Sequence, residues 1–151
     1  MTALFDRCPS FLPRLPLALL LGLGLSACGE DPRQGVHPNG TLAWTSQWEN
    51  GHLHGLERRF REDGSLLQEG HWHQGLRDGT WTFFGEAGGP ERVENWNKGL
   101  RSGEWKSFHA DGSLAAEGRY LDGDKDGPWI TYGPGGETAG TQIWERGTRL
   151  E

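Results

Sequence analysis

The sequence predicts an all-β protein, an elongated single sheet of stacked antiparallel β-hairpins in five repeats of 24 residues. The chain has 151 residues, of which 25 are Gly, and each Gly in a helix interior costs about 1 kcal/mol relative to Ala. Eight Trp, six Phe and two Tyr argue against disorder, since disordered chains are poor in aromatic residues. Gly and the aromatic residues recur at one spacing along most of the chain, and this is the strongest of the three observations.

Glycine marks the repeat most clearly. It recurs every 24 residues, and in four of the five units a second Gly follows four residues after the first. We expect these glycines to turn the chain from one hairpin into the next, where the backbone needs conformations that Gly adopts readily. The predicted turn residues are Gly51, Gly55, Gly75, Gly79, Gly99, Gly103, Gly123, Gly127 and Gly147.

Aromatic residues keep the same period and predict the packed part of the sheet. A single hairpin cannot bury an aromatic face alone, so consecutive hairpins must stack. The predicted core residues are Trp48, Trp72, Trp81, Trp96, Trp105, Tyr120, Trp129, Trp144, Phe60, Phe84, Phe108 and Tyr132. Trp44 lies outside these columns, and we expect it to be the Trp residue most open to a ligand.

Each unit is too short for two stable helices and a turn, but it suits a β-hairpin. The segment Trp81–Phe84 is β-prone, and Asp63–Gly64 is a turn dipeptide that accepts positive φ. We expect Gly70 and Gly118, within strands, to leave room for a large ring from an adjacent strand. The aromatic ends of Trp81–Phe84 are three residues apart, which requires a β-bulge or a sheet buried on both faces. About ten strands are predicted, roughly 45 Å in all at ~4.8 Å per strand.

The start of the chain has a different composition from the repeats. Arg7 and Arg14 precede an apolar run, Leu15–Leu25, which is about as long as a signal-peptide core. The run is too short for a membrane-spanning helix, which takes about 20 residues. It ends in Leu25–Cys28, which resembles the lipobox of bacterial lipoproteins. The resemblance implies that the leader is removed before Cys28 and that this residue carries the lipid anchor.

The sequence therefore predicts a lipoprotein signal peptide at 1–27, a lipidated Cys with a polar tether at 28–36, and a repeat domain at 37–151. Gly29 follows the Cys, and by resemblance to Gram-negative lipoproteins this implies export to the outer membrane, facing the periplasm. The processed chain would keep 13 basic and 20 acidic residues, a balance that disfavours nucleic acid and anionic lipid as partners of the repeats. An ordinary cleaved signal peptide with a chance Cys is the alternative.

The segment Gly70–Phe84 resembles a MORN repeat, in the variant with the frame G-x-W-x-x-G-x-x-x-G-x-W-x-x-[FY]. The same frame is found in the YwqK-like antitoxins of bacterial toxin–antitoxin systems. The resemblance covers about residues 37–151 and implies a single run of β-hairpins. It also implies a scaffold for protein or lipid contacts rather than an enzyme.

Few residues form a candidate metal or catalytic site. His52 with His54, and His71 with His73, are imidazole pairs two residues apart, and on a strand each pair would face one side as metal ligands require. We place the first pair in an inter-hairpin turn and interpret both as surface decoration, so neither a metal nor a cofactor is predicted. The segment Asp122–Gly127 imitates half of an EF-hand loop, but Gly stands where the bidentate Glu is required.

The predicted function is a membrane-anchored, non-enzymatic scaffold that presents its repetitive surface to a protein or another envelope component. The sequence contains no nucleophile elbow and no phosphate-binding loop, and processing at Cys28 would leave no reactive thiol. One alternative is an antitoxin-like or immunity-like protein that binds and neutralises a toxin. Another is a metal-binding protein or hydrolase of the envelope.

Overall fold

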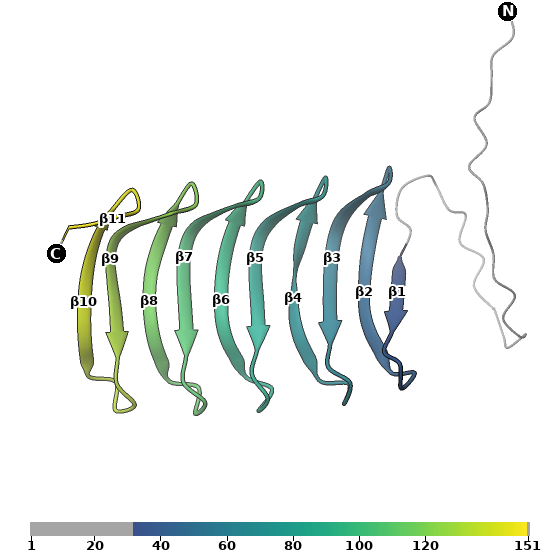
Figure 1. The fold of residues 1–151 in the computed structure, drawn as a ribbon, viewed down its shortest axis with the longest axis horizontal. Helices are drawn as coiled ribbons and strands as arrows, with labels where there is room; N and C mark the ends of the chain where they lie inside the picture. The colour runs from purple at the N-terminus through teal and green to yellow at the C-terminus, as the bar shows by residue number, and fades with distance from the viewer. Residues whose placement is uncertain (1–31, 151) are drawn as a thin grey trace, which may run out of the picture.

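The computed structural model describes residues 32–150, which form one antiparallel sheet of eleven strands (Figure 1). Each strand pairs only with its neighbours in sequence. The strands are β1 (Arg33–Val36), β2 (Leu42–Glu49), β3 (His52–Phe60), β4 (Leu66–His73), β5 (Leu76–Phe84), β6 (Pro90–Asn97), β7 (Leu100–Phe108), β8 (Leu114–Leu121), β9 (Asp124–Tyr132), β10 (Thr138–Glu145) and β11 (Thr148–Arg149). The predicted all-β single sheet of stacked hairpins is confirmed, with eleven strands where about ten were expected.

Two-residue turns join the strands along one long edge of the sheet. Each consists of a non-Gly residue followed by Gly, both at positive φ, as in Gln74 (51°) and Gly75 (79°). Two successive positive φ angles define a type I′ turn, whose twist matches that of hairpin strands. The five turns are Asn50-Gly51, Gln74-Gly75, Lys98-Gly99, Asp122-Gly123 and Arg146-Gly147. The segment that imitates an EF-hand loop is therefore one of these turns, continued into β9.

Longer loops join the strands along the opposite edge. In the loop between β3 and β4, the Arg61 amide donates to the Ser65 carbonyl (2.9 Å), and the Gly64 amide donates to the Arg61 carbonyl (2.9 Å). The Asp63 carboxylate accepts a hydrogen bond from the Ser65 amide (2.8 Å). This bonding to Ser65 lowers the pKa of Asp63 below its ordinary value. The Asp-Gly dipeptide thus closes the loop through both its carboxylate and its positive-φ glycine.

Consecutive hairpins are hydrogen-bonded to each other through the type I′ turns. The Gly75 amide donates to the Leu53 carbonyl of the preceding unit (2.8 Å). The same bond recurs from Gly99 to Arg77, from Gly123 to Arg101 and from Gly147 to Lys125. Because this bond recurs four times, each hairpin meets the next in the same register. This regular register agrees with the constant 24-residue period.

The second predicted series of turn glycines lies inside strands. These glycines have φ between 71° and 101°, and the strand pairing shifts register next to them. For example, Gly79 lies in β5 opposite the shift between Gly70 and His71 of β4. They are Gly55, Gly79, Gly103 and Gly127, in β3, β5, β7 and β9. A glycine with positive φ at a register shift forms a β-bulge, which needs the same backbone freedom as a turn. Trp81 and Phe84 are three residues apart and therefore lie on opposite faces of β5, so the sheet carries aromatic residues on both faces. The nearby register shift adds its extra residue, Glu91, to β6.

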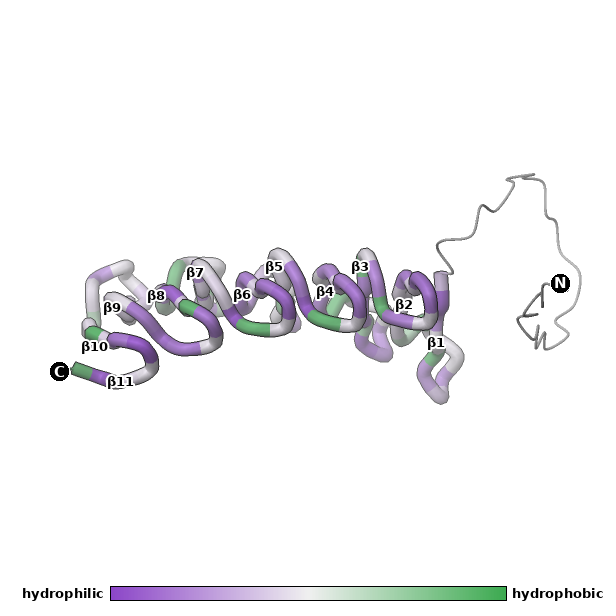
Figure 2. The backbone as a smooth tube through the Cα atoms, turned by 90° about the horizontal axis from the view of Figure 1, so that it is seen from above, coloured by the Kyte–Doolittle hydropathy of each residue, from purple (hydrophilic) through white to green (hydrophobic). Residues whose placement is uncertain are grey.

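The sheet is one layer thick, so its core consists of rings laid over neighbouring strands. Trp81 is fully buried and Trp129 is 8% exposed. A Cβ atom at Gly70 would overlap the indole of Trp81, and one at Gly118 would overlap the indole of Trp129. The expectation that these two strand glycines leave room for a large ring is confirmed. Hydrophobic positions recur along the sheet between longer hydrophilic stretches (Figure 2).

Residues 33–36, which the sequence assigns to a polar tether, form strand β1 instead. Gly35 lies opposite Trp44 of β2, whose indole occupies the space that a Cβ at Gly35 would need. Arg33 lies 4.4 Å from the ring centroid of Trp48. These ring contacts hold β1 on the sheet, and the partly buried indole of Trp44 packs over Gly35.

The predicted signal peptide at 1–27 and the lipidated Cys28 lie outside the described residues. Within residues 32–150 there is no helix with the length and apolar character needed to cross a membrane.

Candidate functional site

One face of the sheet carries a row of aromatic rings with cationic side chains among them. We call it the indole–cation face, because its members contact one another through ring stacking, cation–π contacts and ion pairs. Its aromatic residues are Trp48, Trp72, Trp81, Phe83, Trp96, Trp105, Tyr120, Trp129 and Trp144. Its cationic residues are Arg33, Arg59, Arg77, Arg92, Arg101 and Lys125.

The aromatic residues and cations of this face are paired by the strand register. Across the tight turns, Trp72 lies opposite Arg77, and Trp96 lies opposite Arg101. Tyr120 and Lys125 form the equivalent pair in the next unit. Each pair lies 24 residues after the previous one, so the sheet carries one aromatic–cation pair for every two strands.

Each cation lies over rings that come from at least two strands. The guanidinium carbon of Arg77 is 4.2 Å from the ring centroid of Trp81 and 5.0 Å from that of Trp96. The Arg101 guanidinium is 5.1 Å from the centroid of Trp96, and the Lys125 ammonium is 4.0 Å from that of Trp129. Distances below about 6 Å give attractive cation–π contacts. The three cations are therefore held in place by the rings beneath them.

Glu94 lies in the middle of this face and is 1% exposed. Its Oε1 is 2.9 Å from Arg92 Nε and 3.6 Å from Arg101 Nη2. Its Oε2 accepts a hydrogen bond from the indole nitrogen of Trp96 (3.1 Å). A buried carboxylate is tolerated only when it is paired and hydrogen-bonded in this way. Glu94 also fixes two arginines, whose side chains are 41% and 40% exposed.

Glu57 has the same role at the N-terminal end of the face. It is 3% exposed, pairs with Arg59, and accepts a hydrogen bond from the indole nitrogen of Trp72. In the strand register it lies opposite Gly70, on whose other side Trp81 lies. Glu57 thus stands where the next unit has Trp81, and it forms an ion pair with Arg59 instead of burying an indole.

Burial lowers the pKa of the Arg77 guanidinium, and the carboxylates of Glu94 and Glu57 act in the opposite direction. An arginine side chain nevertheless stays protonated in proteins. Arg77 therefore remains a cation on this face at any physiological pH.

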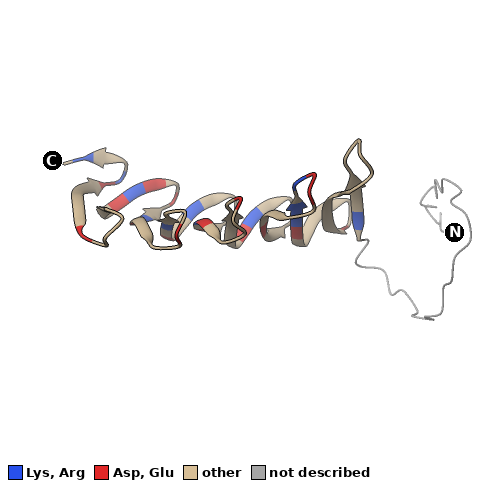
Figure 3. Cartoon of the chain, turned by 90° about the horizontal axis from the view of Figure 1, so that it is seen from below, with Lys and Arg blue, Asp and Glu red and all other residues tan. Residues whose placement is uncertain are grey.

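The opposite face carries both signs of charge in exposed or partly exposed pairs. Arg58 Nε lies 3.1 Å from Glu69 Oε2, and Arg119 Nη2 lies 2.6 Å from Asp126 Oδ2. The hydrogen bond from Arg119 lowers the pKa of Asp126. Acidic and basic positions recur along the whole sheet (Figure 3). The carboxylates on this face are more open to solvent than the buried pair on the indole–cation face.

The aromatic series at the ends of β3, β5, β7 and β9 is half-buried, and its members are Phe60, Phe84, Phe108 and Tyr132. The Tyr132 hydroxyl donates to Glu117 Oε1 (2.7 Å), which raises the pKa of Tyr132. This tyrosine therefore contacts the face opposite to the indoles, and the predicted core residues are divided between the two faces.

The structure brings two of the four candidate histidines together. The rings of His54 and His73 lie 5.0 Å apart, and His54 Nδ1 lies 3.4 Å from Glu49 Oε2. His52 and His54 belong to strand β3 rather than to a turn, because the tight turn ends at Gly51. Within residues 32–150 there is no group of three His, Cys, Asp or Glu residues placed to hold a metal ion.

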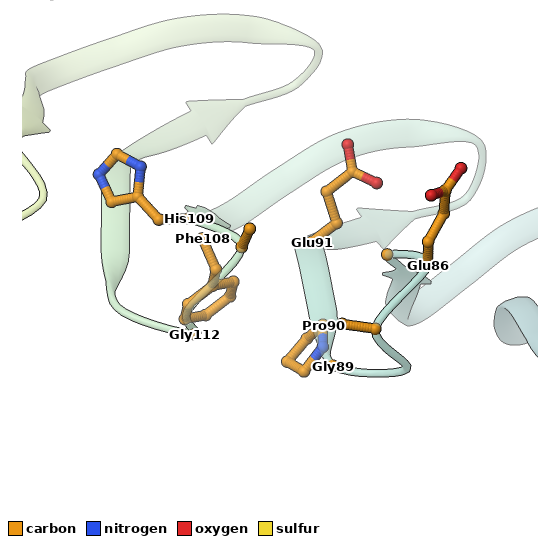
Figure 4. Close-up of a pocket in the computed structure, with 10 residues that line it drawn as sticks. Glu86, Gly89, Pro90, Glu91, Phe108, His109 and Gly112 are labelled. Atoms are coloured by element: carbon orange, nitrogen blue, oxygen red, sulfur yellow. The ribbon is translucent and has the colours of Figure 1, made fainter.

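An open groove of about 710 Å³ lies between the β5–β6 loop and the β7–β8 loop (Figure 4). In other units a side chain bridges the two neighbouring loops at this level. His109 Nε2 lies 3.1 Å from the carbonyl oxygen of Tyr132, and Arg61 donates to the carbonyl of Phe84. Gly85 is the equivalent residue here, and it has no side chain to make the bridge. The groove is thus a position where one repeat lacks a contact that the others make.

The cations of the indole–cation face are the residues that sequence reasoning missed. The sequence does contain a signal for them, because basic residues recur every 24 residues, as the aromatic residues do. These basic residues are Arg77, Arg101, Lys125 and Arg149. The first unit has Leu53 at that position, which interrupts the series. Buried Glu57 and Glu94 had no such signal, since each occurs at its position in a single unit.

A comparison with protein families agrees with this repeat architecture. The family model described as the MORN repeat variant matches residues 53–74 and 101–122. No curated protein matches the chain. One similar solved structure is the crystal structure of accessory secretory protein 1,2 and 3 in Streptococcus pneumoniae, at 11% identity and a TM-score of 0.41. That match covers 67% of this chain and 19% of the solved chain, so this chain spans about a fifth of the length of the solved chain. The two segments that match the MORN repeat variant begin 48 residues apart, which is two of the 24-residue units.

Proposed function

We propose that the protein is a membrane-anchored lipoprotein that works as a non-enzymatic scaffold, with its repeat sheet presented to a protein partner in the cell envelope. The observation that carries the proposal is the indole–cation face, on which rings fix the cations in a regular row. A surface organised in advance loses less side-chain entropy when a partner binds. The match to the MORN repeat variant supports a repeat module rather than a catalytic domain.

The membrane part of the proposal rests on the sequence Leu25–Cys28. Lipid chains on Cys28 would anchor the protein, since each buried CH₂ contributes about 0.8 kcal/mol and several chains are needed for stable attachment. The anchor would place the sheet on the periplasmic side, and Gly29 supports the outer membrane as the site in a Gram-negative host.

The anchor is tested by intact mass and membrane fractionation of the wild-type protein beside Cys28→Ala. We expect a wild-type mass equal to residues 28–151 plus acyl chains, recovered with membranes, and loss of both properties in the variant. A full-length, unmodified wild-type protein in the cytoplasm would refute the proposal and would favour the antitoxin alternative.

The scaffold is tested by site-specific crosslinking in living cells. A photo-crosslinking residue in place of Arg101 should give a defined adduct, whereas the same residue in place of Arg119, on the opposite face, should not. Both side chains are substantially exposed, at 40% and 60%, so the two positions report on the faces rather than on accessibility. Equal adducts from both positions would contradict a partner on the indole–cation face.

A further inference from the structure

Three cations form a regular row along the length of the sheet, and we call Arg77, Arg101 and Lys125 the cation ladder. Each occupies the same place in its unit, over rings of its own and the adjacent unit. One unit contributes two strands, so the ladder repeats about every 9.6 Å at ~4.8 Å per strand. The row runs perpendicular to the strands.

The indole–cation face is basic although the chain as a whole is acidic, with a formal net charge of −6. Its contact network holds six cations and two carboxylates, Glu57 and Glu94. The carboxylate side chains are 4% and 2% exposed, whereas those of Arg59 and Arg101 are 55% and 40% exposed. A ligand approaching this face therefore meets cations, and its charge should be negative.

If the negatively charged ligand is a peptide, the spacing of the ladder can be compared with the spacing of side chains in each backbone conformation. A polyproline II helix has three residues per turn and a rise of 3.1 Å, so every third side chain returns to the same side after about 9.3 Å. In a β-strand, side chains on one face recur after about 6.7 Å, which does not match. Two turns of an α-helix take about 10.8 Å, and this mismatch grows to about 2.4 Å over the two intervals of the ladder.

Resting on the proposed scaffold function, we infer that the cation ladder binds a proline-rich segment of a partner protein in the polyproline II conformation, with an acidic side chain at every third position. The carboxylates pair with Arg77, Arg101 and Lys125. The prolines between them lie against the edges of the indole rings, as proline-rich ligands do in aromatic-lined grooves. The rigid polyproline II helix loses little entropy on binding, which suits a surface whose cations are already fixed.

The test is a titration of a fluorescent 12-residue peptide, four repeats of Glu-Pro-Pro, with the full-length protein in mild nonionic detergent. The matched control peptide has the same length and composition in two repeats of Glu-Pro-Glu-Pro-Pro-Pro, which breaks the three-residue spacing. We expect the regular peptide to bind about tenfold more tightly, a difference of about 1.4 kcal/mol. Binding should weaken as ionic strength rises, because exposed charges are screened.

Variants of the protein separate charge from fold. Arg77→Gln with Arg101→Gln should weaken binding about tenfold, because it removes two of the three charges of the ladder. Arg77→Lys with Arg101→Lys should retain most of the affinity, which a general loss of folding would not allow. The matched control, Arg58→Gln with Arg119→Gln, removes the same charge from the opposite face and should leave binding unchanged.

The inference fails if the two peptides bind equally, if neither binds at low ionic strength, or if the opposite-face control weakens binding as much as the ladder variant. It also fails if polygalacturonate, or phosphatidylglycerol carried in the same detergent micelles, displaces the regular peptide at equal charge concentration. The titration in detergent does not depend on lipidation. If wild-type protein is acylated and recovered with membranes but fails to bind the peptide in detergent, the ligand is refuted and the proposed anchor stands.

Discussion

Placing a single methyl group on Gly118 should damage the sheet more than its size suggests. The new Cβ would overlap the indole of Trp129, which is 8% exposed and donates to the Arg119 carbonyl at 3.3 Å. Overpacking costs about 1–3 kcal/mol, and loss of the indole hydrogen bond adds about 0.5–1.5 kcal/mol. We therefore expect Gly118→Ala to lower the free energy of unfolding by about 2–4 kcal/mol.

The assay is urea and thermal denaturation followed by far-UV circular dichroism, with Gly89→Ala as the control. Gly89 lacks positive φ and a Cβ there would meet no atom within 4 Å, so alanine should be neutral or slightly stabilising at that site. For a sheet of this size, the expected loss at Gly118 corresponds to a fall in Tm of roughly 10 °C. Equal stability of the two variants would refute the close packing of Trp129. Partial recovery in Gly118→Ala combined with Trp129→Leu would support it.

Three further predictions address the turns, the groove and the opposite face. Lys98→Asn should raise the unfolding free energy by several tenths of a kcal/mol in urea denaturation, because Asn adopts the positive φ of a type I′ turn more readily. Gly85→His should restore the missing bridge to the Phe108 carbonyl and stabilise the sheet by about 0.5–1.5 kcal/mol, and an unchanged Tm would contradict this. Glu117→Gln should lower the pKa of Tyr132, measured by phenolate absorbance in a chain with two Tyr, whereas an unchanged titration would count against the hydrogen bond. Because the pKa of Tyr132 is raised on folding, this hydrogen bond stabilises the protein below about pH 10, and its contribution is lost as the pH rises through the raised pKa.

The fold could be predicted from the sequence because its determinants are local and repeated. A tight turn such as Gln74-Gly75 needs positive φ, and the glycine that supplies it recurs once per unit. The same reasoning could not separate turns from bulges, because Gly79 within β5 has the same backbone requirement. The strand pairing that distinguishes the two depends on the neighbouring chain segment, which a single unit does not reveal.

The candidate site was less accessible to sequence reasoning. The burial of Glu94 depends on Arg92, Arg101 and Trp96, which approach it only when three strands are assembled. The histidines show the same dependence on assembled strands. His54 and His73 belong to different pairs in the sequence, and the fold brings their rings to 5.0 Å.

Pairing only between sequence neighbours has a mechanical consequence. The first and last described strands lie at opposite ends of the sheet, so a force that pulls them apart acts along the hydrogen bonds and loads them one strand at a time. Such a sheet unfolds in steps, as strands separate from one end of the sheet. Each released unit of 24 residues can extend to about 80 Å at 3.3–3.6 Å per residue, from about 9.6 Å when folded. The folded chain would therefore act as an extensible tether, lengthening under load in increments of about 70 Å while the remaining hairpins stay intact.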